Sequence, residues 1–282
     1  AGEVKNNGWE LTVGYRHQLE NGFSWDISGN ISKYTNEITK LPETVAANGK
    51  YGGNGVKSVV GHAMFSQVGY IADGIFKSQD EIDNHAIQEG AGIGRIRYKD
   101  LNGDGIITEA DQDWIYDPTP DFTWGLNIYL QYKDWDLTMF WQGVQGVDVD
   151  CRGYKSQTDF WANSAINVPY LNKGIRVLDA WTPLNYDSNI PALTTSDTNN
   201  EGRVSSYYIE NGSYAKLRTI QLGYNIPKKV IDKLKLDRIR IYASAQNLIT
   251  IKSNKFTGND PENPGFGYPI PLNLTFGVNV GF

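Results

Sequence analysis

The sequence predicts an all-β fold of antiparallel strands, and three observations carry this prediction. Apolar residues alternate strictly with small or polar ones over residues 272–282, up to the final Phe282. This period of two gives a strand one apolar and one polar face. The same alternation fills a hairpin around a turn with Asn-Gly chemistry at 20–22. Short and long connections alternate along the chain, as in bacterial outer-membrane barrels.

The composition of the 282 residues suits an aromatic-rich β protein, with 30 Gly, 17 Tyr and 8 Trp. The net charge of −6 argues against a nucleic-acid partner, because no basic stripe is present to neutralise phosphates. A lone cysteine, Cys151, excludes an internal disulfide framework. The first residues do not resemble a signal peptide, so we expect the chain to be the latter part of a longer protein.

Seven alternating segments are expected to form the long strands, at 9–19, 23–32, 122–132, 135–143, 220–226, 239–245 and 272–282. The connections at 20–22, 133–134 and 227–236 are short, whereas those at 35–120, 149–205 and 252–270 are long. Barrels of the outer membrane place long loops outside the cell and short turns in the periplasm. A further strand near 68–76 then belongs to the first long loop. An odd count also predicts missing upstream strands, because complete bacterial barrels have an even number.

The alternation alone allows two interpretations of the apolar strand faces. The faces could contact lipid in a transmembrane barrel, or they could form the core of a soluble β-sandwich. The asymmetry of loop lengths favours the barrel. Tryptophans near strand ends would then form interfacial girdles, namely Trp9, Trp25, Trp124, Trp135 and Trp141.

One stretch has the spacing of an EF-hand-type calcium loop. Oxygen-bearing groups fall at loop positions 1, 3, 5, 7 and 12, which are Asp100, Asn102, Asp104, Ile106 (through its carbonyl) and Asp111. Gly105 permits the sharp turn at position 6. An aspartate replaces the usual glutamate at position 12, as in dockerin-like loops, and should weaken the site. The sequence therefore predicts a structural Ca²⁺ clamp, with a metal-free cluster of Asx turns as the alternative.

Aromatic residues in the second long loop are candidates for ligand contacts, because flat rings stack on sugars. These residues are Tyr154, Trp161, Tyr170 and Trp181. No catalytic arrangement is evident: His17, His62 and His85 share no metal-ligand spacing, and no pair of carboxylates is singled out. The chain is therefore expected not to be an enzyme, although a surface glycosidase is a weaker alternative.

Several sequence motifs are spread over nearly the whole chain. They are Tyr-Ile-Ala-Asp-Gly-Ile-Phe at 70–76, Gly-Arg-Ile-Arg-Tyr-Lys-Asp-Leu-Asn-Gly-Asp-Gly at 94–105, Tyr-Ile-Glu-Asn-Gly-Ser-Tyr-Ala-Lys-Leu-Arg at 208–218, Leu-Gly-Tyr-Asn-Ile-Pro at 222–227, Ala-Ser-Ala-Gln-Asn-Leu at 243–248, and the closing strand. In sequence and in order, these motifs resemble the SusC/RagA family of TonB-dependent outer-membrane transporters of Bacteroidetes.

This resemblance implies an antiparallel transmembrane β-barrel of about 22 strands with an N-terminal plug. Residues 1–282 would form its C-terminal segment, with extracellular loops at 35–120, including the calcium-type loop 100–111, and at 149–205. The plug and early strands are absent from this chain. Such transporters import oligosaccharides or peptides, driven by the proton-motive force through TonB, under a SusD-like surface lipoprotein lid. The rival interpretation is a secreted β-sandwich carbohydrate-binding module with a dockerin-like calcium loop.

Overall fold

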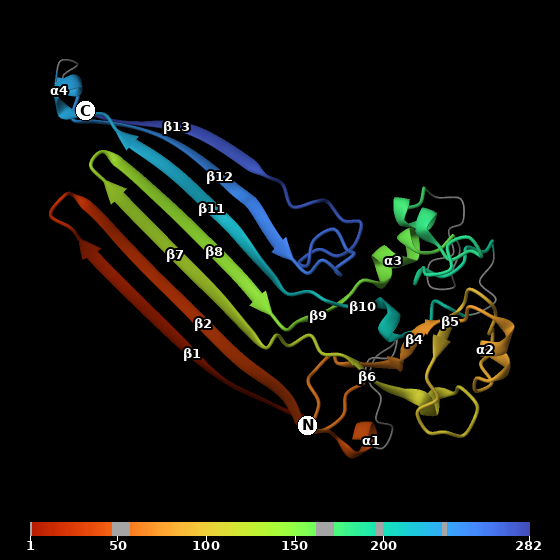
Figure 1. Cartoon of the computed structure of the whole chain (residues 1–282). Helices are drawn as coiled ribbons and strands as arrows, with labels where there is room; N and C mark the ends of the chain where they lie inside the picture. Colours follow the sequence, from red (N-terminus) through yellow and green to blue (C-terminus); the bar gives the residue numbers. More distant parts are fainter. Residues whose placement is uncertain (1, 47–56, 162–171, 196–199, 233–235) are drawn as a thin grey trace.

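Seven long antiparallel strands form one sheet in the computed structural model, which describes residues 2–46, 57–161, 172–195, 200–232 and 236–282. Their order is β1-β2-β7-β8-β11-β12-β13, so each strand lies beside its neighbours in the chain (Figure 1). The seven-stranded sheet confirms the predicted number of spanning strands. The strands are β1 (Glu3–Gln18), β2 (Phe23–Lys40), β7 (Phe122–Tyr132), β8 (Trp135–Gln145), β11 (Tyr214–Asn225), β12 (Arg238–Lys252) and β13 (Asn273–Gly281).

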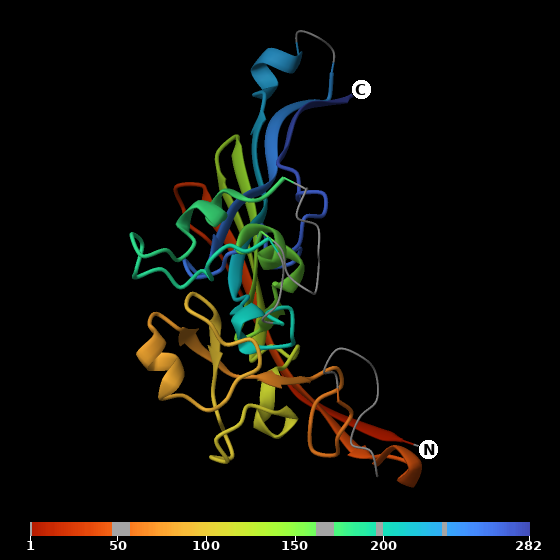
Figure 2. The ribbon, with the colours of Figure 1, turned by 90° about the vertical axis from the view of Figure 1, so that its right-hand side faces the viewer.

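The two ends of the sheet differ, as the connection lengths predicted. The short turns, the small helix α4 (Lys228–Ile231) and the C-terminus gather at one end, which is called the turn end below (Figure 1). The long connections and their small elements gather toward the other end, called the loop end (Figure 1, Figure 2). The first hairpin turn forms because Gly22 adopts a positive φ of 85° and the Asn21 side chain accepts a hydrogen bond from the Phe23 N–H.

Short strands at the loop end pair with one another and not with the main sheet, as far as the described residues show. Three two-stranded sheets join β3 with β6, β4 with β5, and β9 with β10. The region 68–76 therefore stays outside the main sheet, as predicted. The elements are α1 (Glu43–Ala46), β3 (Gln67–Tyr70), β4 (Ala72–Ile75), α2 (Gln79–Asp83), β5 (Ile96–Tyr98), η1 (Glu109–Asp111), β6 (Gln112–Tyr116), β9 (Asp148–Asp150), α3 (Arg152–Thr158), η2 (Ile175–Asp179), η3 (Ser206–Tyr208) and β10 (Ile209–Asn211).

Two predicted boundaries differ from the structure. Strand β2 continues to Lys40, so the first long loop begins later than residue 35. The outer part of β2 remains paired with β1 although its apolar alternation has faded. The sequence over 78–89 has helical character, with Ser78 and Glu81 in the spacing of a capping box, but the helix is limited to α2. The Ser78 side chain caps α2 by accepting a hydrogen bond from the Glu81 N–H.

The main sheet exposes its apolar face. On β1 and β13, Val13, Leu274 and Val278 are 62%, 63% and 60% exposed. A β-sandwich would bury such a face under a second sheet, and no second sheet covers it among the described residues. The structure thus argues against the sandwich interpretation. None of the helices in the described ranges is long and apolar enough to span a membrane.

A double irregularity interrupts the alternation of β11 and β12. The register shifts between Leu217 and Thr219, where Arg218 is the extra residue on β11 relative to β8. Opposite this bulge, Asn247 on β12 adopts a positive φ of 56°. Because of the bulge, two consecutive residues of β11 share the polar face.

Candidate functional site

The polar face of the sheet carries ion pairs near the loop end. The Lys216 ammonium group is 1% exposed and donates to Asp260 Oδ1 at 2.7 Å and Glu262 Oε2 at 2.6 Å. Arg218 also donates to Glu262, and the Tyr214 hydroxyl donates to Glu262 Oε1 at 2.7 Å. These contacts hold the loop between β12 and β13 against the inner side of the wall.

The Glu262 carboxyl is strongly acidic in this arrangement. Burial alone would raise its pKa, but hydrogen bonds from Lys216, Tyr214 and Arg218 outweigh burial and lower the pKa to about 2. The carboxylate therefore stays charged at any physiological pH. None of these residues was singled out from the sequence, although a lysine and an arginine inside a strand were a signal of inward-facing charge.

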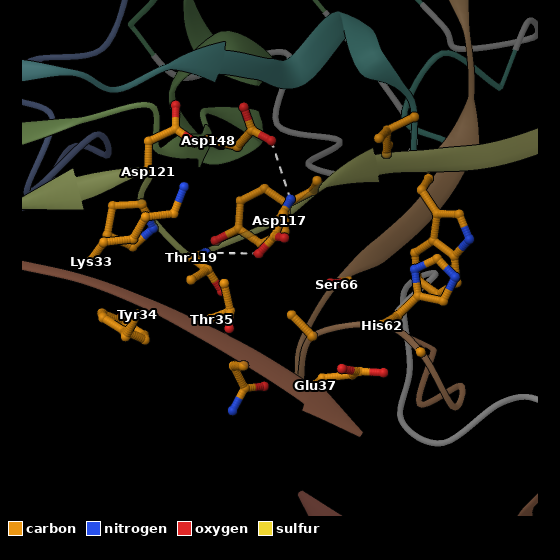
Figure 3. A pocket seen from close by; sticks show the side chains of 17 residues that line it. Lys33, Tyr34, Thr35, Glu37, His62, Ser66, Asp117, Thr119, Asp121 and Asp148 are labelled. Atoms are coloured by element: carbon orange, nitrogen blue, oxygen red, sulfur yellow. Dashed lines mark hydrogen bonds between the residues drawn. The ribbon is translucent and has the colours of Figure 1, made fainter. Parts of the chain in front are cut away.

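A cavity of about 530 Å³ lies where the wall meets the loops, and we call it the rim cavity. It is bounded by the outer part of β2, the segment 61–66, the residues linking β6 to β7, and the start of β9 (Figure 3). The segment 61–66 is fixed to β2 by hydrogen bonds from the Ile38 N–H to the His62 carbonyl and from the Gly61 N–H to the Ile38 carbonyl. Backbone hydrogen bonds thus hold one side of the cavity in place against β2.

Three aspartates, Asp117, Asp121 and Asp148, give the rim cavity an acidic wall (Figure 3). Asp148 Oδ2 accepts a hydrogen bond from the Asp117 N–H at 3.2 Å. Asp121 lies against Gly146, where a Cβ atom would come within 1.9 Å of its carboxylate. Burial raises the pKa of Asp148, the Asp117 N–H partly offsets this, and the charges of Asp117 and Asp121 raise it further.

Aromatic rings and one amine complete the rim cavity. The His62 ring stacks on Trp114 with a centroid distance of 3.6 Å and an interplanar angle of 19°. Lys33 is the only lysine or arginine among the described residues that line the cavity. Burial and the charges of nearby aspartates raise the pKa of Tyr116, so this hydroxyl stays protonated as a donor. Carboxylate acceptors beside flat rings can bind hydroxyl-rich or cationic groups.

The calcium-type loop is an ordered turn organised by its own acidic side chains. Asp100 Oδ2 accepts from the Gly105 N–H at 2.9 Å, and Gly105 has the expected positive φ of 83°. Both oxygens of the fully buried Asp111 accept backbone hydrogen bonds, from Leu101 and Asn102 to Oδ1 and from Thr108 to Oδ2. Burial alone would raise the pKa of Asp111, but these N–H groups keep it below its ordinary value.

The donor set of this loop fits a cation in part. The side chains at positions 1, 3 and 5, from Asp100, Asn102 and Asp104, are oxygen ligands of the kind Ca²⁺ prefers. The Ile106 carbonyl takes no part in the backbone bridge to Ile87, which uses Gly105 and Ile107. Within the described residues, however, no group of three or more His, Cys, Asp or Glu side chains gathers closely enough to hold a metal ion.

Of the four aromatic loop residues predicted to contact a ligand, the structure describes three, and these three have different surroundings. Tyr154 in α3 stacks on Phe266 at 4.8 Å, and Trp161 is 41% exposed after α3. Trp181 is 7% exposed, and a Cβ at Gly94 would lie 2.9 Å from its ring, so it packs within the loop region. Tyr170 lies outside the described residues.

The loop region has its own core and its own buried ion pairs. Its core contains Ile96, Tyr98, Ile107, Phe160 and Tyr208. Around this core, Lys155 donates to Glu210 Oε1 at 2.8 Å, and Glu210 Oε2 accepts from the Thr257 N–H at 2.7 Å. Two connections of the chain, the one that contains α3 and β10 and the one that contains residue 257, are therefore linked through one carboxylate.

An exposed apolar face of paired strands, polar residues inside, and packed loops at one end define a section of outer-membrane β-barrel wall. No family model matches the chain. The sequence is 30% identical to the TonB-dependent receptor P3 of Formosa agariphila and 28% identical to the TonB-dependent receptor SusC of Bacteroides thetaiotaomicron. Both matches cover 100% of this chain, but only 29% and 27% of the relatives.

Solved structures show the same architecture. A structure of the RagAB peptide transporter matches with a TM-score of 0.76 at 22% identity, over 100% of this chain and 29% of that one. The RagAB peptide importer in its open-open state matches with a TM-score of 0.74 at 21% identity. The chain belongs to the SusC/RagA family of TonB-dependent receptors of the outer membrane. It spans less than a third of the length of the relatives it matches.

Proposed function

We propose that the protein containing this chain imports nutrient oligomers across the outer membrane, driven through TonB, with oligosaccharides favoured over peptides as cargo. The relatives support the class of importer, because the curated ones are named as TonB-dependent receptors. The rim cavity supports the cargo class. Its carboxylates can accept hydrogen bonds from sugar hydroxyls, and its rings offer flat apolar surfaces (Figure 3).

Growth tests this proposal most directly. A strain lacking the full-length protein should lose growth on particular oligosaccharides while its growth on peptides and monosaccharides is unchanged. The variants Trp114→Ala and Asp148→Asn in the rim cavity should lower oligosaccharide uptake about tenfold, as expected for ~1.4 kcal/mol of lost binding. The exposed Asp113→Asn on the same strand as Trp114 is the matched control. Selective loss of growth on peptides would instead assign a peptide cargo.

We also propose that a SusD-like lipoprotein closes over the loop end and contacts η2. Ile175 and Leu178 on η2 are 81% and 78% exposed, and Leu184 nearby in sequence is fully exposed. Apolar side chains this exposed are typical of binding surfaces. Ile175→Asp with Leu178→Asp should reduce co-purification of the lipoprotein, whereas Val60→Asp at another exposed site of the loop end should not. Equal recovery with all variants would place the lid elsewhere.

The calcium clamp remains a proposal for the loop 100–111. A cation would draw Asp100, Asn102 and Asp104 together and would stiffen the connection between β5 and β6. Calcium should then protect this loop in the full-length receptor from proteolysis, and Asp104→Ala should remove the protection. The same substitution without calcium serves as the control. If calcium has no effect on the cleavage rate of the unsubstituted protein, the loop is a metal-free cluster of Asx turns.

A further inference from the structure

A groove of about 500 Å³ lies on the apolar face of the wall toward the turn end. Its floor is Ala243 on β12. One side is formed by Leu222 and Tyr224 on β11, and the other by Phe276 and Val278 on β13. The groove therefore runs along β12 between two ridges of larger side chains.

The strand register explains why the surface is hollowed at this point. Ala243 is paired with Leu222 on one side and with Phe276 on the other, so a small side chain lies between two large ones. Adjacent strands are ~4.8 Å apart, so the two ridges are separated by about 9.6 Å, which admits one hydrocarbon chain. The Tyr242 ring cannot fill the space, because it covers Gly277 on the opposite, polar face.

The groove is complete within the described chain and remains open to the bilayer. Phe276 is 80% exposed, and Leu222 and Ile241 are 45% and 44% exposed. Strands β8, β11, β12 and β13 are paired in sequence around it. Further strands of the barrel would extend the sheet beyond β13 without covering this face. In the outer membrane, only lipid or another protein can contact these side chains.

The position of the groove indicates which lipid leaflet supplies its occupant. Trp135 is the first residue of β8 after the turn, and its ring lies 4.6 Å from that of Tyr224. Such paired aromatic residues mark the membrane–water interface. The groove thus starts at the interface on the turn side, which is the periplasmic side for this class of barrel, and extends toward the bilayer centre.

Basic residues occupy the turns at this end of the sheet (Figure 1). Lys228 and Lys229 are exposed in α4, which follows directly after the end of β11. Lys133 occupies the neighbouring turn between β7 and β8. The same two turns also contain Asp134 and Asp232. An anionic headgroup would therefore be attracted at the lysines themselves and not over the whole turn end. A lipid phosphate near α4 would be attracted by these lysines.

We propose that this groove binds one acyl chain of a glycerophospholipid of the periplasmic leaflet, with its anionic headgroup at the lysines of α4. The lipid would fill the surface depression above Ala243 and anchor the last three strands of the chain in the bilayer. This proposal depends on the outer-membrane location, not on which cargo the protein imports.

The test uses full-length receptor purified in mild detergent, with bound lipids identified by native mass spectrometry. The unsubstituted protein should retain phosphatidylglycerol, and Ala243→Leu, which fills the groove, should retain roughly tenfold less. Val13→Leu, on the same apolar face but outside the groove, is the matched control and should retain as much as the unsubstituted protein. Lys228→Gln with Lys229→Gln should lower retention of phosphatidylglycerol but not of phosphatidylethanolamine.

Three outcomes would overturn the proposal: equal retention by the Ala243→Leu variant, retention of lipopolysaccharide instead of phospholipid, or a change in oligomeric state with no change in lipid. A second measurement avoids dependence on the folding of the variant. Diazirine-labelled phosphatidylglycerol should crosslink to unsubstituted receptor at Leu222, Ile241 or Phe276. Adducts spread evenly over the apolar faces of β1 and β2 would contradict a specific groove.

Discussion

The edge strands β1 and β13 of the wall leave apolar side chains exposed, whereas the loop region contains a buried apolar core and buried ion pairs. Val13 on β1 is 62% exposed, but Tyr98 and Tyr208 in the loop core are completely buried. Lipid solvates the first region, so its stability depends on backbone pairing between strands. The second region folds as a water-soluble domain does, with a core and satisfied buried charges. The two regions should therefore respond differently to the same kind of substitution.

The largest effect is expected where the two regions meet, at Lys216. Lys216→Met leaves Asp260 and Glu262 without their buried cation, and breaking a buried pair in this way costs about 3–5 kcal/mol. The heat-modifiable band of the folded receptor should be lost at a lower temperature, and the loop after β12 should become protease-sensitive. Lys255→Met, at an exposed lysine of the same loop, should change neither.

A smaller effect is expected inside the loop core, at Phe160. This side chain is 2% exposed, and Phe160→Ala should cost about 3 kcal/mol, because the cavity left behind can collapse only partly. The cost should appear as faster proteolysis of the loop region while the wall strands keep their hydrogen-exchange protection. Val13→Ala in the lipid-facing wall should cost under about 1 kcal/mol by the same assay. Equal losses in both variants would show that the two regions unfold together.

The smallest effect is expected from protonation of Glu262, and it should appear only in acid. Its pKa is lowered from 4.5 to about 2, so its ion pairs stabilise the loop fully above pH 4.5 and lose their effect as pH falls toward 2. Proteolysis by an acid protease should show this loop opening in that window. Glu262→Gln should abolish the pH dependence. Opening of the loop well above pH 4.5 would contradict the assignment to this carboxylate.

The strands predicted best are those whose alternation is unbroken. Strands β7 and β8 were anticipated nearly to the residue, because alternating side chains and a two-residue turn fix both register and length. Strand β11 was recognised only from Ile220 although it begins at Tyr214, and β12 only up to Ala245 although it continues to Lys252. In both strands the prediction fails at the double irregularity, where the period of two changes phase.

The rim cavity and the buried ion pairs could not be predicted from the sequence. Asp121 and Asp148 lie in different connections and meet only because β7 and β8 pair beneath them. Likewise, Lys155 and Glu210 are far apart in the chain and come together through the pairing of β9 with β10. Local patterns carry no information on such contacts. The turn at 100–111 could be anticipated because all its residues lie within one stretch, whereas the binding of a cation there stays a prediction.

The bulge at Arg218 has a consequence for how this strand can change during evolution. Counted back from Tyr224 in steps of two, Lys216 would fall on the lipid side of the wall, and the single extra residue moves it to the inner side. The bulge thus determines which residues of β11 before Arg218 face lipid and which face the inner side of the wall. Deleting one residue there would turn the Lys216 charge toward lipid. The cost of such a change is ~2–4 kcal/mol at the bilayer midplane and falls to ~0–1 kcal/mol near the interface, and Lys216 lies two residues from the loop end of β11. Loops of this protein can therefore tolerate length changes that this strand cannot.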